Sequence, residues 1–300
     1  GVAFRRFFQW LSRPQVVLSL VMLLVMFYMV VIPLYRMLAT TVTVSDGDLR
    51  VIKDATVGSF TWYHWGRMLS SKIAMVMTFE PLLHSITVSL GATFLSLLIG
   101  GLMAWMVVRT DIPGKNVIHL LAIVPYIMPS WTIAQAWLVL FKNQTSGGTM
   151  GMLEFMTGMP TPDWLAYGPL PIIISSALHY YTFFFLFVSS ALLSIDSSLE
   201  EAGELAGASR SRIMRKITLP LVIPAIASGF IMTFSKTMGT FGGPNVLGVP
   251  VRYYTLSTML RSNTGIGNYG DAFVLAIVLI LFSMTTVLFN QRLVGTRESF

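Results

Sequence analysis

The chain has 300 residues and a formal net charge of +7, yet only 11% of its residues are charged and 54% are hydrophobic. A soluble domain carries about 25% charged residues, so this composition excludes an ordinary water-soluble fold. The absence of cysteine excludes disulfides and cysteine-ligated zinc or iron–sulfur sites. The basic residues flank apolar stretches instead of forming one patch, which favours a membrane protein over a nucleic-acid-binding protein.

Six long stretches contain no Asp, Glu, Lys or Arg, and each is close to the roughly 20 residues that a helix needs to cross the hydrocarbon layer. We therefore predict an all-α integral membrane protein, a single domain over 1–300, with six transmembrane helices at about 14–35, 84–108, 116–141, 169–195, 220–241 and 271–291. The first stretch is too long for the core of a cleaved signal peptide, and no small-residue cleavage site follows it, so we expect it to be a span.

Two intervening segments are too polar to cross a membrane. The segment 40–81 contains an aromatic run at 60–65 that predicts an interfacial helix, with His64 as an interface anchor. The segment 143–168 predicts an outer loop with a short turn. If both termini are cytoplasmic, the inner segments carry 11 Lys and Arg residues and the outer segments carry 8, so the positive-inside rule favours that orientation.

The inner loop 196–219 joins the fourth and fifth spans. Ser198, followed three residues later by Glu201, predicts a capping box with Ser198 as N-cap, and Gly207 predicts the end of this short helix. Small residues recur four apart, so one helix face would let another surface approach closely: Ala202 and Ala206, Gly203 and Gly207. Ser209 then predicts the cap of a second, basic helix that leads to Pro220 at the start of the fifth span. An ordinary polar connection is the alternative interpretation of this loop.

The spacing within the loop resembles the "EAA" signature of bacterial ABC importer permeases: Glu201-Ala202-Gly203, three residues, Gly207, nine residues, then Ile217-Thr218-Leu219-Pro220. Gly203 departs from that pattern, which commonly has Ala there. The segment 109–115 resembles another inner loop of the same superfamily. The segments 192–201 and 241–248 resemble the ferric-iron permease branch, which lies near the polyamine and sulfate branches.

This resemblance implies the type I ABC importer permease fold, in the bacterial cytoplasmic membrane. It also implies three partners: an extracytoplasmic solute-binding protein, a second permease half that is identical, separate or fused, and a cytoplasmic ATPase dimer. Because ATP and Mg would belong to the ATPase, we expect no catalytic, cofactor or metal site on this chain. The ATPase would engage the helix at 198–207, and the coupling residues would be Ser198, Glu201, Ala202, Gly203, Gly207, Ile217, Leu219 and Pro220. Ferric iron or an iron chelate is the first solute that the resemblance suggests; polyamine, phosphonate, sulfate and sugar phosphate stay open.

Four residues inside predicted spans are candidates for the solute pathway. A lone ammonium such as Lys236 either lines a water-filled path, where it would meet an anionic solute, or reaches the outer interface along its stem. His179, Tyr180 and Tyr181 offer polar contacts to a solute, with helix packing as the favoured alternative.

Other function classes lack their sequence features. A secondary transporter or channel driven by an ion gradient would need acidic groups inside the membrane, but the six long apolar stretches contain no Asp or Glu. An intramembrane enzyme would need convergent His, Asp or Ser residues. Gly114-Lys115 does not match a phosphate-binding loop, and the four histidines are scattered.

Overall fold

The computed structural model describes the backbone of residues 13–295, which is helical apart from loops and one isolated bridge between Thr43 and Phe60. Five helices are long and apolar enough to cross a membrane, and a bent pair of helices makes a sixth candidate. The five are α2 (Pro14–Thr41), α4 (Glu80–Arg109), α11 (Pro169–Ser194), α14 (Leu219–Met238) and α17 (Tyr269–Gly295). The all-α membrane fold that the sequence predicts is therefore confirmed.

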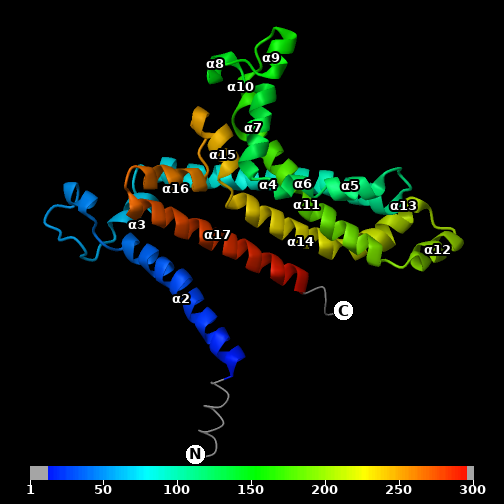
Figure 1. Ribbon diagram of the computed structural model, residues 1–300, viewed down its shortest axis with the longest axis horizontal. Coiled ribbons are helices and arrows are strands. Elements are labelled where there is room, and N and C mark those ends of the chain that lie inside the picture. The colour runs from blue at the N-terminus through cyan, green and yellow to red at the C-terminus, as the bar shows by residue number, and fades with distance from the viewer. Residues whose placement is uncertain (1–12, 296–300) are drawn as a thin grey trace, which may run out of the picture.

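The centre of the molecule is a bundle in which α4, α11 and α14 lie side by side (Figure 1). The buried face of α4 consists of small residues three or four positions apart: Ser85, Ser89, Ala92, Ser96, Gly100 and Ala104. A Cβ atom on Gly100 would lie 2.3 Å from the carbonyl oxygen of Tyr181 on α11, so only glycine allows this approach of the two backbones. Membrane helices associate through such small-residue faces because lipid provides no hydrophobic force between them.

The predicted third span, 116–141, is not one continuous helix. It consists of α5 (Lys115–Leu121), α6 (Val124–Ile127) and α7 (Ser130–Phe141), with a bend of 98° between Ile127 and Ser130. The cause is Pro129, which disfavours helical geometry at the preceding residue; Met128 accordingly has ψ 146°. Pro125 lies in the first turn of α6, where its missing N–H breaks no hydrogen bond of that helix. Length and composition alone do not reveal such a break.

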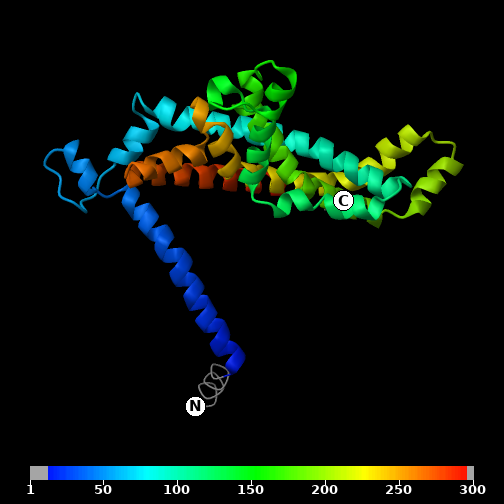
Figure 2. The same cartoon turned by 45° about the horizontal axis from the view of Figure 1, so that its top comes forward.

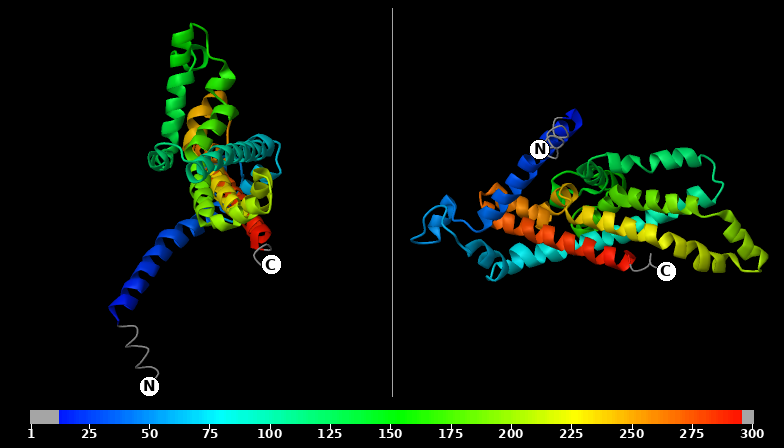
Figure 3. Two further views of the ribbon diagram at one scale, coloured as in Figure 1. Left: turned by 90° about the vertical axis from the view of Figure 1, so that its right-hand side faces the viewer. Right: turned by 90° about the horizontal axis from the view of Figure 1, so that it is seen from below.

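As a result, α7 leaves the bundle at its side and carries a small arm (Figures 1 and 3). The arm contains the short helices α8 (Gln144–Gly147), α9 (Met152–Thr157) and α10 (Asp163–Ala166), so the predicted loop 143–168 has more structure than a single turn. The segment returns to α11 at Pro169. Next to α7 lies α15 (Gly242–Leu247), followed by η4 (Val249–Val251).

The two ends of the bundle differ. One end, called here the α3 end, carries η1 (Asp46–Arg50), α3 (Tyr63–Leu69), η2 (Met75–Phe79) and α16 (Leu256–Gly265). The opposite end, called the α12 end, carries α12 (Ser197–Leu205), α13 (Arg210–Ile213) and η3 (Met214–Thr218). The predicted interfacial helix corresponds to α3, which begins at Tyr63, within the aromatic run. Helix α2 points away from the bundle, contacting it through α17, and none of its most apolar window is buried (Figure 2).

Both η2 and η3 are π-helical turns, and each is followed by one residue and then a proline, Pro81 or Pro220. A proline lacks the N–H of the helix ladder and its ring clashes with the carbonyl four residues earlier. The wider π-turn shifts the ladder at this point, as the bond from the Leu219 N–H to the Met214 carbonyl shows. Helical structure therefore continues from Arg210 to Met238, and Pro220 lies within it instead of at its start.

Candidate functional site

The N-cap of helix α12 lies two residues earlier than predicted. It is Asp196, whose side chain accepts a hydrogen bond of 2.9 Å from the Ser198 backbone N–H. The predicted capping box with Ser198 as N-cap is wrong, because a carboxylate already occupies the cap position and is favoured by the helix dipole. Hydrogen bonds from the backbone and side chain of Ser198 lower the pKa of Asp196.

The end of α12 depends on Gly207, as predicted. Gly207 has φ +78°, its N–H donates to the Glu204 carbonyl at 2.9 Å, and the Ala208 N–H donates to the Gly203 carbonyl at 3.0 Å. These two bonds form a Schellman motif, which satisfies carbonyls at the helix end. No atom lies within 4 Å of a Cβ placed on Gly207, so the requirement for glycine here is conformational.

The inner face of α12 packs on the helix that follows it. A Cβ on Gly203 would lie 3.1 Å from Cγ1 of Ile213 and 3.4 Å from Cδ1 of Ile217. Ile217, which belongs to the signature, therefore packs against the inner face of α12. Ser209 is the N-cap of α13, although its side chain makes no capping hydrogen bond.

The outer face of α12 is uncovered and mostly small or apolar. Glu201, Ala202 and Ala206 are exposed, and Leu205 is 91% exposed. The small side chains of Ala202 and Ala206 beside Leu205 leave this face open to close approach by another surface. Leu219 and Pro220, the first two residues of α14, are also exposed.

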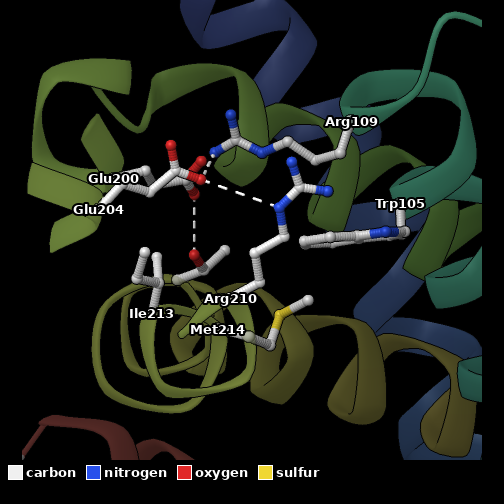
Figure 4. A pocket seen from close by; sticks show the side chains of 8 residues that line it. Trp105, Arg109, Glu200, Glu204, Arg210, Ile213 and Met214 are labelled. Carbon is white, nitrogen blue, oxygen red and sulfur yellow. Dashed lines mark hydrogen bonds and ion pairs between the residues drawn. The ribbon is translucent and has the colours of Figure 1, made fainter. Parts of the chain in front are cut away.

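The sequence pattern indicates Glu201 and does not identify the role of the neighbouring acid, Glu200. Oε1 of Glu200 lies 3.0 Å from Nη2 of Arg109, the last residue of α4, and accepts a hydrogen bond of 2.8 Å from the Thr218 hydroxyl. These side chains border a cavity of about 350 Å³, whose walls also include Trp105 and Arg210 (Figure 4). The available signal was the resemblance of segment 109–115 to an inner loop, which placed Arg109 on the same side as α12.

The aromatic candidates for the solute pathway pack against other residues of this chain. His179 is 6% exposed and its Nδ1 lies 2.9 Å from the Pro125 carbonyl oxygen. The Tyr180 hydroxyl donates to Thr240 at 3.4 Å, and Tyr181 belongs to a core cluster with Phe185.

Lys236 lies elsewhere, on a face of α14 that no part of the chain within residues 13–295 covers. It is exposed and forms a stripe with three other exposed residues spaced four apart: Pro224, Ser228 and Met232. Within residues 13–295, no group of three His, Asp or Glu side chains is placed to hold a metal ion.

A family model for the inner membrane component of binding-protein-dependent transport systems matches residues 96–295 of the chain. Among curated relatives, the molybdenum transport system permease protein ModB of Escherichia coli (strain K12) is 27% identical over 233 residues, covering 72% of this chain and 95% of the relative. The molybdate/tungstate transport system permease protein WtpB of Thermococcus kodakarensis is 25% identical, covering 73% and 80%. A probable sulfate transport system permease protein of Marchantia polymorpha is 21% identical, covering 70% and 71%.

Solved structures share the fold. A bacterial ABC transporter chain involved in alginate import superposes with a TM-score of 0.69 at 17% identity, covering 97% of this chain and 99% of that chain. A chain of the inward-facing MetNI methionine ABC transporter gives a TM-score of 0.56 at 16% identity, covering 75% and 98%. Because the family model spans more than half of the sequence, this chain belongs to the family of binding-protein-dependent transport system inner membrane components and is the permease subunit of an ABC importer.

Proposed function

We propose that this permease is driven by a cytoplasmic ATPase that engages the outer face of α12, and that its solute is a tetrahedral oxyanion, molybdate or tungstate first. The observation that carries the coupling role is the exposed face of α12, with Leu205 91% exposed on a helix capped at both ends. ATP hydrolysis belongs to the separate ATPase subunit.

A short capped helix suits the transmission of force. Its caps at Asp196 and Gly207 hold its length and direction, so a groove on the ATPase would move it as a rigid body. The small side chains of Ala202 and Ala206 permit close approach, and Leu205 provides an apolar anchor.

The test of this role replaces residues on that face in the reconstituted complex. We expect Glu201→Lys or Gly207→Trp to abolish solute-stimulated ATP hydrolysis while membrane insertion is retained, because Glu201→Lys reverses a charge on the exposed face and Gly207→Trp strains the left-handed backbone that ends α12. The matched control is Asp111→Lys, since Asp111 is a fully exposed acid near the end of α4. Normal stimulation in both variants would contradict the assignment.

The solute is inferred from the relatives and from α14. The relatives reported above are permeases for molybdate, tungstate or sulfate, and they give no support to ferric iron as the first solute. The uncovered stripe of α14 carries the ammonium of Lys236 and a hydroxyl, Ser228, but no carboxylate. A cation and a hydroxyl suit an oxyanion, whereas a ferric ion would be met by like charge. Sulfate, with the same shape and charge, is the alternative.

Uptake into vesicles that contain the importer and its binding protein distinguishes these solutes. We expect uptake of molybdate to exceed uptake of sulfate and ferric citrate, and Lys236→Met to reduce molybdate uptake about tenfold, or about 1.4 kcal/mol. Lys236→Arg retains the charge and is the matched control. Ferric uptake unaffected by Lys236→Met would overturn the oxyanion proposal.

We further propose that the chain lies in the bacterial inner membrane with both termini cytoplasmic, beside a second permease half and beneath an external solute-binding protein. This orientation places α12 on the side of the membrane where ATP is. The chain has no native cysteine, so a single Ser209→Cys substitution reports its side directly. Labelling of that cysteine by an impermeant reagent added outside would contradict the proposed orientation.

A further inference from the structure

We propose that the Arg109–Glu200 ion pair, called here the strut, is the link through which α12 moves α4 when the ATPase pulls. Glu200 is a different residue from the signature acid Glu201 and lies on the opposite, inner side of the helix. This inference rests on the proposed coupling role of α12.

Three elements meet at one oxygen atom. Oε1 of Glu200, on α12, lies 3.0 Å from Nη2 of Arg109 at the end of α4 and accepts the 2.8 Å hydrogen bond from Thr218 at the end of η3. The side chains of Arg109 and Glu200 are 17% and 25% exposed, and Thr218 is 2% exposed. Figure 4 shows the two charged groups reaching toward each other across the mouth of the cavity.

The cavity explains why the strut matters. Helix α12 packs directly on Ile213 and Ile217, which lead into α14, but a cavity of about 350 Å³ lies between α12 and the end of α4. Among the side chains that the structure describes, the strut is the one ion pair or hydrogen bond that joins α12 to α4. Motion of α12 thus reaches α14 through packing and α4 through the strut.

Among the described side chains, Glu200 is the carboxylate within 4.0 Å of the Arg109 guanidinium, so the pair resists separation. The Nε and Nη2 atoms of Arg109 are buried and make no hydrogen bond of good geometry, so Glu200 is the group that compensates its charge. Moving α12 away from α4 would separate this half-buried pair and leave the two buried nitrogens of Arg109 without their counter-charge, which costs free energy until water reaches them. The two elements are therefore expected to move together.

A second pair on the same loop provides a matched control. Glu204 lies 3.9 Å from Arg210, with side chains 58% and 95% exposed, and both residues belong to the loop itself. Such an exposed pair contributes little. Glu204→Gln removes the same charge from the same helix without touching α4.

The experiment measures whether α12 and α4 move as one body. Spin labels are placed on Leu199→Cys, exposed on α12, and Asp111→Cys, just beyond α4, in the full complex with its ATPase. We expect the distance between the labels to be the same without nucleotide and after trapping with ATP and vanadate. In Arg109→Gln or Glu200→Gln we expect the distance to change on trapping, because α12 then follows the ATPase without α4.

The charge-reversed double variant, Arg109→Glu with Glu200→Arg, is expected to restore the constant distance, and Glu204→Gln to leave it constant throughout. Thr218→Val, which removes a hydrogen bond but no charge, serves if a charge variant fails to assemble; it should give a smaller change in the same direction. A constant distance in Glu200→Gln, a changing one in the unsubstituted complex, or no restoration in the double variant would overturn the proposal.

Failure of the strut is distinguishable from failure of the proposed function. A Leu205→Cys variant that forms no disulfide with any cysteine introduced along the ATPase surface refutes the coupling role of α12. If that disulfide forms but the distance between the spin labels in the trapped state is the same with and without Glu200→Gln, the strut is refuted and the coupling role of α12 stands.

Discussion

His64 illustrates what sequence reasoning misses at the scale of one residue. It lies among aromatics and was expected to anchor the interface, but it is 3% exposed and is held between two carboxylates. Its Nδ1 lies 2.9 Å from Asp271 of α17 and its Nε2 lies 3.3 Å from Asp48 of η1, while Arg67 contacts the other oxygen of Asp271 at 3.4 Å. Asp271 lies 207 residues from His64 in the sequence and Asp48 lies on another element, so no local pattern indicates that the two carboxylates meet at this histidine.

The cluster predicts a pH dependence of stability. Burial alone lowers the pKa of His64, but the hydrogen bond to Asp271 and the charges of Asp48 and Asp271 outweigh it, so the pKa is raised above 6.5. A group whose pKa is raised on folding stabilises the protein fully below its unfolded pKa, and this stabilisation is lost as the pH rises through the folded pKa. The positive charge of Arg67 opposes the shift without cancelling it.

We expect the thermal unfolding temperature of the purified complex to fall by about 3 °C between about pH 6 and pH 8, and His64→Gln to remove most of that fall. Glu80→Gln is the control, because Glu80 lies 4.0 Å from another histidine, His84, but is half-exposed. A slope unchanged by His64→Gln would show that folding does not shift the pKa of His64, and would contradict this prediction.

At the scale of elements, the length of stretches without charged residues predicted where the helices lie better than where they break. It placed α2, α4, α11, α14 and α17 because a lipid-exposed helix must be long and uncharged. It failed at Pro129, where backbone geometry and not composition decides. The loop 196–219 was predicted as two short helices, and the error at its N-cap arose because Asp196 and Ser198 are both good caps. Neither the cavity nor the strut was predictable, since each depends on how α4 and α12 approach.

The contact of Gly203 with η3 gives a prediction for α12. Gly203→Ala brings a Cβ to 3.1 Å from the flexible side chain of Ile213, a cost that the gain in helix propensity, about 1 kcal/mol, offsets. We expect Gly203→Ala to preserve stimulated ATP hydrolysis and Gly203→Leu to reduce it about tenfold, because the larger side chain lifts α12 off η3. Hydrogen exchange of the α12 amides should accelerate in Gly203→Leu and not in Gly203→Ala. Equal protection in both variants would contradict this packing.

At the scale of the whole molecule, several apolar surfaces have no counterpart within the described chain. The most apolar window of α2 is 0% buried, the α14 stripe at 224–236 is open, and Phe155 on the arm is 79% exposed. A chain of this family is one component of a binding-protein-dependent transport system and not an ion-driven secondary transporter or channel, so lipid and the other components are available to cover these surfaces. Lipid can cover α2, but a stripe that bears Lys236 needs water or a partner.

These surfaces lead to a prediction about assembly. One bundle with one α12 forms half of a pathway, because alternating access requires two bundles that rock about a shared axis. One α12 can engage one ATPase subunit, whereas an ATPase dimer presents two grooves. We therefore expect two permease halves and two ATPase subunits, measured as the mass of the intact complex released from detergent. A matched control is the complex carrying Gly207→Trp, which should keep the paired permease halves while losing the ATPase subunits, since Gly207 ends α12 and is not part of the α14 stripe at 224–236. Molybdate uptake by a complex whose mass corresponds to one permease half and one ATPase would contradict the pairing, because such a complex has no second bundle against which the first can rock.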